Sequence, residues 1–137
     1  MKAAILALLA AVSVGCHSTA RPFEIHYTFT DHPNEHRIGV KFVNDRPYDV
    51  CLSPEFWPNR AGKIDQASDE VYLIIEGRRF PIVEFNTGYC PSTCDTRVAP
   101  GEEVQSYIPY RDFGVPENLS ASSKELEFSP LAYKCIR

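Results

Sequence analysis

The cysteines constrain this fold more than any other feature of the sequence. The chain has five of them: Cys16, Cys51, Cys90, Cys94 and Cys135. Cys90 and Cys94 are only four positions apart, in a segment that Gly88 and Pro91 interrupt. Cysteines whose Cα atoms are more than about 7 Å apart cannot be bridged without backbone movement. A bridge between Cys90 and Cys94 therefore requires a tight, irregular loop, and the stretch predicts such a loop.

The first residues predict export. Met1-Lys2 is a short positive segment, and an apolar run follows from Ala3 to Val12. This run is too short to cross a bilayer as a helix, and its arrangement is that of a secretory signal peptide. We assign residues 1–15 to the signal, 16–22 to a tether and 23–137 to one domain, which is long enough for one core.

Two cleavage sites are open. Ser13-Val14-Gly15-Cys16 resembles the lipobox of bacterial lipoproteins, in which the cysteine is lipidated, although leucine is usual where Ser13 stands. Cleavage after Ala20, a small-x-small site, is the alternative and gives a secreted or periplasmic protein. We expect lipidation at Cys16. In lipoproteins an aspartate in place of His17 would imply inner-membrane retention, so the resemblance implies the outer membrane.

Four cysteines follow Cys16, and in an exported protein they predict two disulfides. Three pairings are open, of which we expect Cys90–Cys94 and Cys51–Cys135. The second closes a long loop, which the chain-entropy model equates with about 4–5 kcal/mol of stability. The spacing of Cys90 and Cys94 is neither that of a thioredoxin-like pair nor that of a zinc site, so we expect a structural role and no metal.

Short alternating segments separated by turn residues predict strands. In Phe23–Thr30, for example, Phe23, Ile25, Tyr27 and Phe29 share one face. The predicted strands are 23–30, 38–42, 48–52, 71–75, 79–85, 104–108, 125–128 and 132–136, of which the last two are either separate or one interrupted strand. No sustained helical stripe occurs. We therefore predict an all-β fold, an immunoglobulin-like β-sandwich of about seven to eight short antiparallel strands.

Turn chemistry adds detail to these strands. We expect 38–42 and 48–52 to form a hairpin, and Gly77-Arg78 to form a type II′ turn. Pro81 cannot donate to a ladder, so its strand is predicted at an edge or with a bulge. Pro100-Gly101 suits a type II turn, because proline presets φ and glycine accepts a positive φ at the next position.

Two stretches resemble known modules. Residues 38–50 look like the strand, asparagine turn and strand that open immunoglobulin-like and fibronectin-like domains. Residues 98–104 are similar to the apolar-x-Pro-Gly-Glu entry into a later strand of these domains. Such patterns occur in the sandwich modules of deuterolysin-type metalloproteases and in BsuPI-type proteinase inhibitors. The resemblance covers about a quarter of the chain and implies a fold and, by analogy, an inhibitory function.

Binding residues are predicted in two loops. Phe56, Trp57 and Arg60 place two aromatics and an arginine in an irregular segment, and Trp, Tyr and Arg are the usual interface anchors. Tyr89 lies beside the cross-linked loop, which loses less entropy on binding than a free loop does. For Trp57 the competing interpretation is a lid over the end of the core, because large aromatics usually bury most of their surface.

Catalysis has no visible constellation of residues, and we predict a protein that is not an enzyme and has no cofactor. A formal net charge of -4 gives no electrostatic reason to bind nucleic acid. We expect a lipid-anchored cell-envelope module that binds or inhibits an envelope or extracellular protein. The alternative is a small periplasmic metal- or ligand-binding protein that uses His32, Glu35 and His36, although Pro33 rules out a shared helical face for the two histidines.

Overall fold

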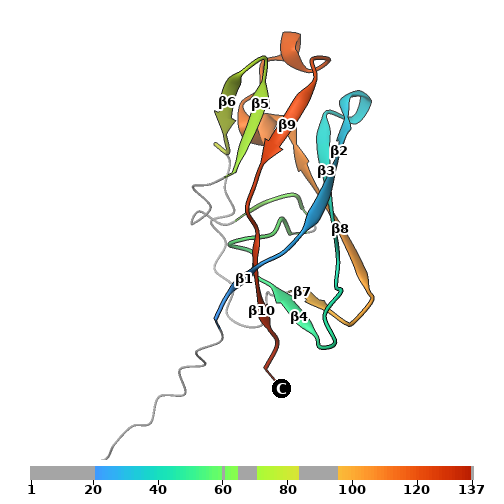
Figure 1. Ribbon diagram of the computed structural model, residues 1–137. Coiled ribbons are helices and arrows are strands. Elements are labelled where there is room, and N and C mark those ends of the chain that lie inside the picture. The colour runs from blue at the N-terminus through green and yellow to red at the C-terminus, as the bar shows by residue number, and fades with distance from the viewer. Residues whose placement is uncertain (1–20, 60, 65–70, 84–95, 137) are drawn as a thin grey trace, which may run out of the picture.

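Antiparallel strands make up the regular structure of the computed structural model, which describes residues 21–59, 61–64, 71–83 and 96–136 (Figure 1). Ten strands and three short 3-10 turns, with no α-helix, occur in these residues. The strands are β1 (Phe23–Glu24), β2 (Tyr27–His32), β3 (Arg37–Val43), β4 (Val50–Leu52), β5 (Tyr72–Ile75), β6 (Arg78–Pro81), β7 (Thr96–Val98), β8 (Glu103–Pro109), β9 (Lys124–Glu127) and β10 (Leu131–Lys134).

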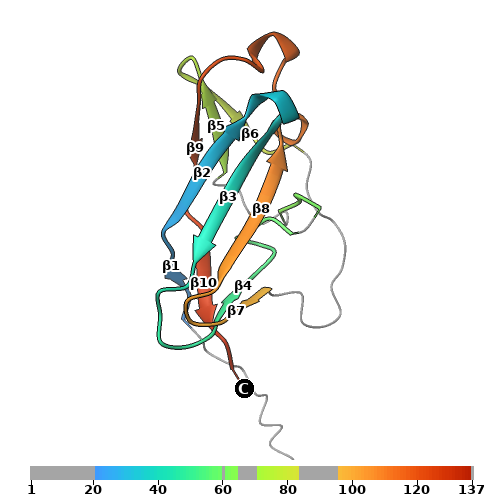
Figure 2. The same cartoon turned by 90° about the vertical axis from the view of Figure 1, so that its right-hand side faces the viewer.

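Three sheets form two layers. The front layer in Figure 2 is the sheet β2-β3-β8. Behind it lie β6-β5-β9 in the upper half and β1-β10-β4-β7 in the lower half. All pairings are antiparallel. The core fills the space between the layers and includes the fully buried Ile38, Leu73 and Ile108.

The N-terminal and C-terminal segments each pass between sheets. Residues 23–30 were predicted as one strand, but the chain leaves the lower back sheet after Glu24 and enters the front sheet at Tyr27. The last segment divides in the same manner, because β9 and β10 belong to different sheets. The strand count of seven to eight was therefore too low. It missed this first break, and it also missed β7, which is only three residues long.

The predicted hairpin between residues 38–42 and 48–52 is wrong. β3 pairs with β2 and β8, whereas β4 pairs with β10 and β7. Asn44 explains the difference, because its buried side chain donates to the carbonyls of Tyr48 and Val98, both at 2.9 Å. These bonds hold the chain in a crossing from the front layer to the back layer.

The turn between β5 and β6 also differs from the prediction. Ile75 pairs with Arg78, so the two loop residues are Glu76 and Gly77, with φ values of 52° and 74°. Positive φ at both positions defines a type I′ turn, whose twist matches that of the strands, and not the predicted type II′ turn at Gly77-Arg78. Pro81 lies on the outermost strand of this sheet, as predicted.

The Pro100-Gly101 turn is confirmed. Gly101 has a φ of 76°, and the N–H of Glu102 donates to the carbonyl of Ala99 at 3.0 Å. The carboxylate of Glu102 accepts a hydrogen bond from the N–H of Ala99 at 2.8 Å and closes the turn from the other side. The turn connects β7 in the back layer to β8 in the front layer.

The Cys51–Cys135 disulfide is also confirmed. It joins β4 to the segment after β10 across a sequence separation of 84 residues. The N–H of Cys135 donates to the carbonyl of Asp49 at 3.1 Å, which extends the pairing of these two segments beyond the strands. The predicted Cys90–Cys94 bridge lies outside the described residues, as does the predicted lipidation site Cys16.

Candidate functional site

The predicted binding loop places its tryptophan in the core. Trp57 is only 2% exposed, and its ring packs against Phe42 and Phe128 with centroid distances of 6.3 Å each. The backbone N–H groups of Phe56 and Trp57 both donate to the carbonyl of Ser53, which folds the segment inward. Among the described residues, the buried indole N–H of Trp57 has no hydrogen-bond partner.

The other predicted anchors are not brought to Trp57 by described contacts. Phe56 is half-buried beside it. Arg60 and Tyr89 lie outside the described residues. For Trp57, the position favours the lid over the core that the sequence offered as the competing interpretation.

The histidine turn is short and non-helical, as Pro33 implied. It is a 3-10 turn over Pro33–Glu35, followed by His36 in the left-handed region with a φ of 51°. Nδ1 of His32 lies 3.8 Å from the Glu35 carboxylate. The His36 ring instead stacks on Tyr110 with a centroid distance of 6.0 Å.

The two imidazoles thus have different aromatic partners, because His32 packs edge-on against Tyr107. No group of three His, Cys, Asp or Glu side chains in the described part of the chain is placed to hold a metal ion. Metal binding by His32, Glu35 and His36 stays a prediction.

A cation and two rings cover a glycine on the outer face of the front sheet. The guanidinium of Arg37 lies 3.7 Å from the centroid of the Tyr107 ring, and His32 packs against the same ring. A Cβ at Gly39 would lie 3.0 Å from the His32 ring, so the glycine makes room for this stack. Glu35 forms an ion pair with Arg37. The outward arginine is therefore neutralised, and the sheet surface around it is closed by packing.

Sequence reasoning missed a buried charged cluster at the upper end of the two layers. The Lys124 side chain is 0% exposed, and its ammonium lies 3.2 Å from the Asp31 carboxylate. The same ammonium donates to the carbonyls of Ser120 and Ser122 at 2.6 and 2.8 Å. Tyr110 donates its hydroxyl to Asp31. This cluster ties β2 of the front layer to β9 of the back layer.

A sequence signal for this cluster exists. Asp31 continues the odd-numbered face of Phe23, Ile25, Tyr27 and Phe29, so alternation alone points its carboxylate inward. An inward charge on an alternating strand requires a partner. Burial and the hydrogen bond to Asp31 both raise the pKa of the Tyr110 hydroxyl, so Tyr110 acts as a donor and not as a base at neutral pH.

A buried carboxylate, that of Asp112, anchors the loop that carries Trp57. Asp112 is 1% exposed, and both of its oxygens lie 2.9 Å from the Lys63 ammonium. Asn59 accepts hydrogen bonds from the N–H groups of Ala61 and Lys63 and closes the loop. The Pro58 carbonyl accepts the Ser106 hydroxyl at 2.8 Å, which places this loop against β8. The loop therefore covers the outer edge of the front sheet at β8.

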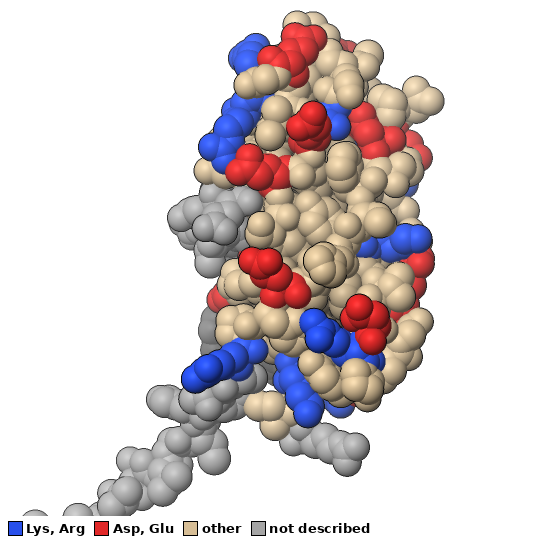
Figure 3. Space-filling view, in the orientation of Figure 1, with Lys and Arg blue, Asp and Glu red and all other residues tan. Residues whose placement is uncertain are grey.

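The opposite edge of the front sheet, at β2, is different. β2 faces β9 across the two layers. Lys124 of β9 contacts Asp31, and the ring of Phe128, the residue after β9, lies 5.2 Å from that of Tyr27. Phe29 lies between these two contacts and is 40% exposed. The strands run close together in Figures 1 and 2, and Figure 3 shows an uncharged band in the middle of this face.

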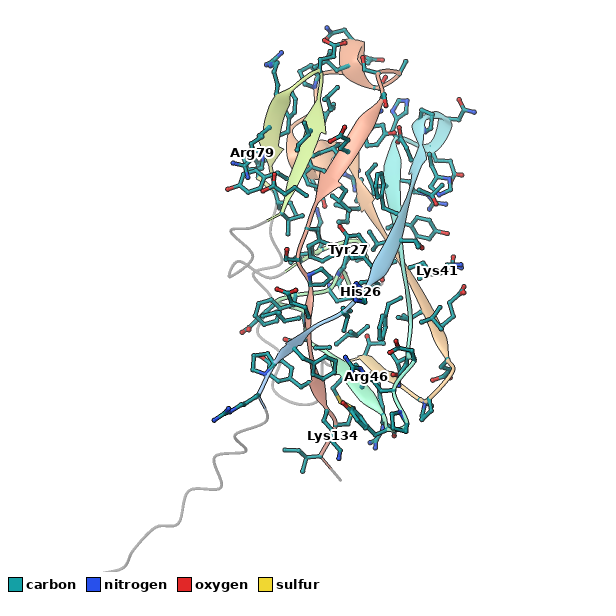
Figure 4. All side chains as sticks on the ribbon, viewed as in Figure 1. His26, Tyr27, Lys41, Arg46, Arg79 and Lys134 are labelled. Atoms are coloured by element: carbon teal, nitrogen blue, oxygen red, sulfur yellow. A yellow bond between two sulfur atoms is a disulfide. The ribbon has the colours of Figure 1, made fainter. Side chains whose placement is uncertain are left out.

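A small hollow lies below this edge, where the chain passes between sheets. Its lining includes Ile25, His26 and Phe42, and the guanidinium of Arg46 lies 5.2 Å from the Phe23 ring beside it. Figure 4 shows His26 at the crossing point and Arg46 below it. The hollow is too small for a ligand larger than a few atoms. The rings of Phe23 and Phe42 form part of its lining.

Comparisons with protein-family models, with curated proteins and with solved structures find no match to this chain. Among the described residues, no helix has the length and apolar character that crossing a membrane requires.

Proposed function

We propose that this protein is a non-catalytic cell-envelope module that binds or inhibits another envelope or extracellular protein. The observation that carries the proposal is the Cys51–Cys135 disulfide. Such bonds persist in oxidising compartments and are rare in the cytosol. Together with the N-terminal signal sequence, the disulfide supports a location outside the cytoplasm. The proposal includes a lipid anchor at Cys16.

The proposal includes an immunoglobulin-like type of sandwich. Two layers of antiparallel strands support it, as does an N-terminal segment that pairs first with one layer and then with the other. Sandwich modules of this kind commonly present their loops and edges to partners. The buried carboxylate of Asp112 and the partly buried carboxylate of Asp31 are each paired with a lysine inside the protein. Their charges thus stabilise the fold, which supports a binding role more than an acid–base role.

The first experiment is the intact mass of the protein purified from its native membrane, with and without reduction and alkylation. A lipid-sized addition at Cys16 with four protected thiols is expected. A mass that begins at Arg21 would replace the anchored protein with a diffusible one. Free thiols at Cys90 or Cys94 would contradict the second predicted disulfide.

The second experiment tests binding directly. Purified protein is incubated with solubilised envelope proteins, and captured proteins are titrated for saturable binding. We expect at least one partner with saturable binding that is independent of added metal. Turnover of a substrate that a point mutation in a polar cluster abolishes would overturn the non-catalytic proposal.

A further inference from the structure

The N-terminal and C-terminal segments lie opposite each other with one constant alignment. In the lower half they form a backbone ladder, in which Phe23 pairs with Ala132 and the Ile25 N–H donates to the Pro130 carbonyl at 3.2 Å. In the upper half the same alignment places Tyr27 opposite Phe128, and Asp31 opposite Lys124. There the connection is made by side chains alone, because β2 pairs only with β3, and β9 only with β5.

The upper half of this alignment is therefore an open edge. Alternate residues of an outermost strand direct their N–H and C=O groups away from their sheet, and such groups can pair with an added strand. In the described part of the chain, β2 (Tyr27–His32) receives hydrogen bonds from β3 and none from another segment on its free side. Six residues are enough for such a pairing.

The edges at β8 and β6 are protected. The residues Pro58 and Gly62 pack on β8, where the Gly62 Cα already approaches the Tyr107 carbonyl closely. β6 is four residues long, carries Arg78 and Arg79, and ends at Pro81. Short length, charge and proline are the usual devices that prevent strand addition. β2 has six residues, no proline and no outward-facing lysine or arginine. Its one charged residue, Asp31, is turned inward, and its charge is paired with Lys124.

An apolar side chain marks the centre of the open edge. Phe29 lies between Tyr27 and Asp31 on the inward face and is nevertheless 40% exposed. By the same alignment the half-buried Leu126 of β9 lies opposite it. An added strand with an apolar side chain at this position would cover the exposed part of Phe29, and removal of apolar surface from water is favourable.

The charge beside the edge selects the partner. Glu125 lies on the outward face of β9 and Glu24 on that of β1, and both are exposed and form no ion pair among the described residues. On the β2 side the outward residues Thr28 and Thr30 are uncharged. Figure 3 shows carboxylates around the uncharged band, with lysine and arginine side chains also present below it and to its right. A second copy of this chain would bring its own carboxylates to this acidic border, whereas a basic strand would neutralise it.

We propose that β2 is a strand-addition site for an extended segment of a partner protein in which apolar residues alternate with lysine or arginine. This inference rests on the proposed binding function and gives it a surface. The backbone of β2 provides affinity, Phe29 and Leu126 accept the apolar side chains, and Glu24 and Glu125 select the basic ones.

The test uses two synthetic ten-residue peptides, one alternating valine with lysine and one alternating valine with glutamate. Amide hydrogen exchange is measured on the intact protein with each peptide, and Kd is measured by fluorescence anisotropy. We expect the lysine peptide to slow exchange at residues 27–32 and to bind at least about tenfold more tightly than the glutamate peptide. Unchanged exchange in β2, or equal affinity for both peptides, overturns the inference.

Variants locate the site. Phe29→Asp is expected to weaken the lysine peptide about tenfold or more, whereas Val43→Asp, at an equally exposed valine on the outer face of β3, is expected to leave Kd unchanged. Glu125→Lys changes an exposed side chain and leaves Phe29 in place. It should reverse the preference, so that the glutamate peptide binds more tightly than the lysine peptide. Equal effects of Phe29→Asp and Val43→Asp, or an unchanged preference in Glu125→Lys, contradict the site.

Two further outcomes separate this inference from the proposed function. If an envelope partner is captured equally by the wild-type protein and by Phe29→Asp, the β2 site is wrong and the binding function stands. If sedimentation shows a dimer in which β2 amides are protected without peptide, a second copy occupies the edge and the inference also fails. If neither peptide nor any envelope protein binds saturably, both proposals fail.

Discussion

The side-chain amide of Asn44 donates a hydrogen bond to the carbonyl of Val98, 54 residues later in the chain, at 2.9 Å. It donates a second bond to the Tyr48 carbonyl, and its own side-chain oxygen accepts the Arg46 N–H. Its backbone is bonded too, to Gly101 and Glu102. A fully buried amide with every group satisfied therefore joins the crossing loop 44–49 to the end of β7.

Replacement of Asn44 by alanine should strongly destabilise the fold. The change removes the donor to the buried carbonyl of Val98 and to the partly buried carbonyl of Tyr48. A buried polar group without a partner costs about 1–3 kcal/mol. We expect a loss of about 2–4 kcal/mol in the free energy of unfolding, measured by denaturant titration. Asn34→Ala, at an exposed asparagine of the histidine turn, is the control and should change it by less than about 0.5 kcal/mol. Equal losses at the two positions would remove Asn44 from its structural role.

Two glycines with the same backbone conformation should respond differently to alanine. Gly62 and Gly101 both have a φ of 76°, so each substitution has the cost of a left-handed residue, about 1–2 kcal/mol. At Gly101 nothing lies within 4 Å of the added Cβ, whereas at Gly62 it would lie 2.4 Å from the Tyr107 carbonyl oxygen. Gly62→Ala should therefore cost at least about 2 kcal/mol more than Gly101→Ala in chemical denaturation. Similar losses of stability for the two substitutions would show that Gly62 does not pack closely against β8.

The strands were predictable where the information is local. Alternation located residues 38–42 and 104–108 correctly, and a short continuous apolar run located 71–75, since both signals are properties of neighbouring residues. Pairing was less predictable because it depends on distant groups. The sequence from β3 to β4 resembles that of a hairpin. In the structure this segment crosses from the front layer to the back layer, where the side chain of Asn44 is bonded to the distant Val98 carbonyl.

The candidate site shows the same division. Large aromatics in an irregular loop suggest an interface. The burial of Trp57, however, depends on Phe42 and Phe128, one from each layer and far apart in the sequence. For Phe29 the difference between prediction and structure is the reverse. Its alternation predicts the core, and its 40% exposure follows only because the sheet ends at β2. A sheet's edge is a tertiary property that strand periodicity does not contain.

Alkaline pH should destabilise the protein through Tyr110. Burial, and then the bond to Asp31, raise the pKa of Tyr110 above its usual value of 10.0 in the folded state. Its contribution to stability is therefore complete below pH 10, where the unfolded chain also holds the proton, and it falls as the pH rises from there toward the folded pKa. Burial raises the pKa of Tyr27 in the same direction. Denaturant unfolding at several pH values from 8 to about 11 should show a shallower alkaline loss in Tyr110→Phe than in the wild-type protein. Parallel curves would contradict this role.

The two expected disulfides should differ in their effect on stability. Cys51–Cys135 closes a loop with a separation of 84 residues, which the chain-entropy model equates with about 4–5 kcal/mol. The predicted Cys90–Cys94 bridge closes a loop of a few residues, worth about 2 kcal/mol in the same model. Thermal and denaturant unfolding of the two double-alanine variants should show the larger loss for Cys51→Ala/Cys135→Ala. A larger loss for Cys90→Ala/Cys94→Ala would mean that this bridge stabilises the fold by more than the chain-entropy term.

The ion pair of Lys124 should contribute far more than a surface pair. Its ammonium is fully buried and bonded to Asp31 and to the carbonyls of Ser120 and Ser122, so Lys124→Met leaves three acceptors without a donor. We expect a loss of about 2–4 kcal/mol in unfolding free energy, somewhat below the cost of breaking a fully buried pair because Asp31 is 25% exposed. Lys41→Met is the matched control, since Lys41 and Glu103 form a pair at 3.3 Å with both side chains more than two-fifths exposed, and such exposed pairs contribute little to stability. A double-mutant cycle with Asp31→Asn then isolates the coupling of the pair itself. Coupling near zero would mean that Lys124 stabilises the fold through the two carbonyls alone, and that the contact between β2 and β9 rests on the aromatic pair of Tyr27 and Phe128.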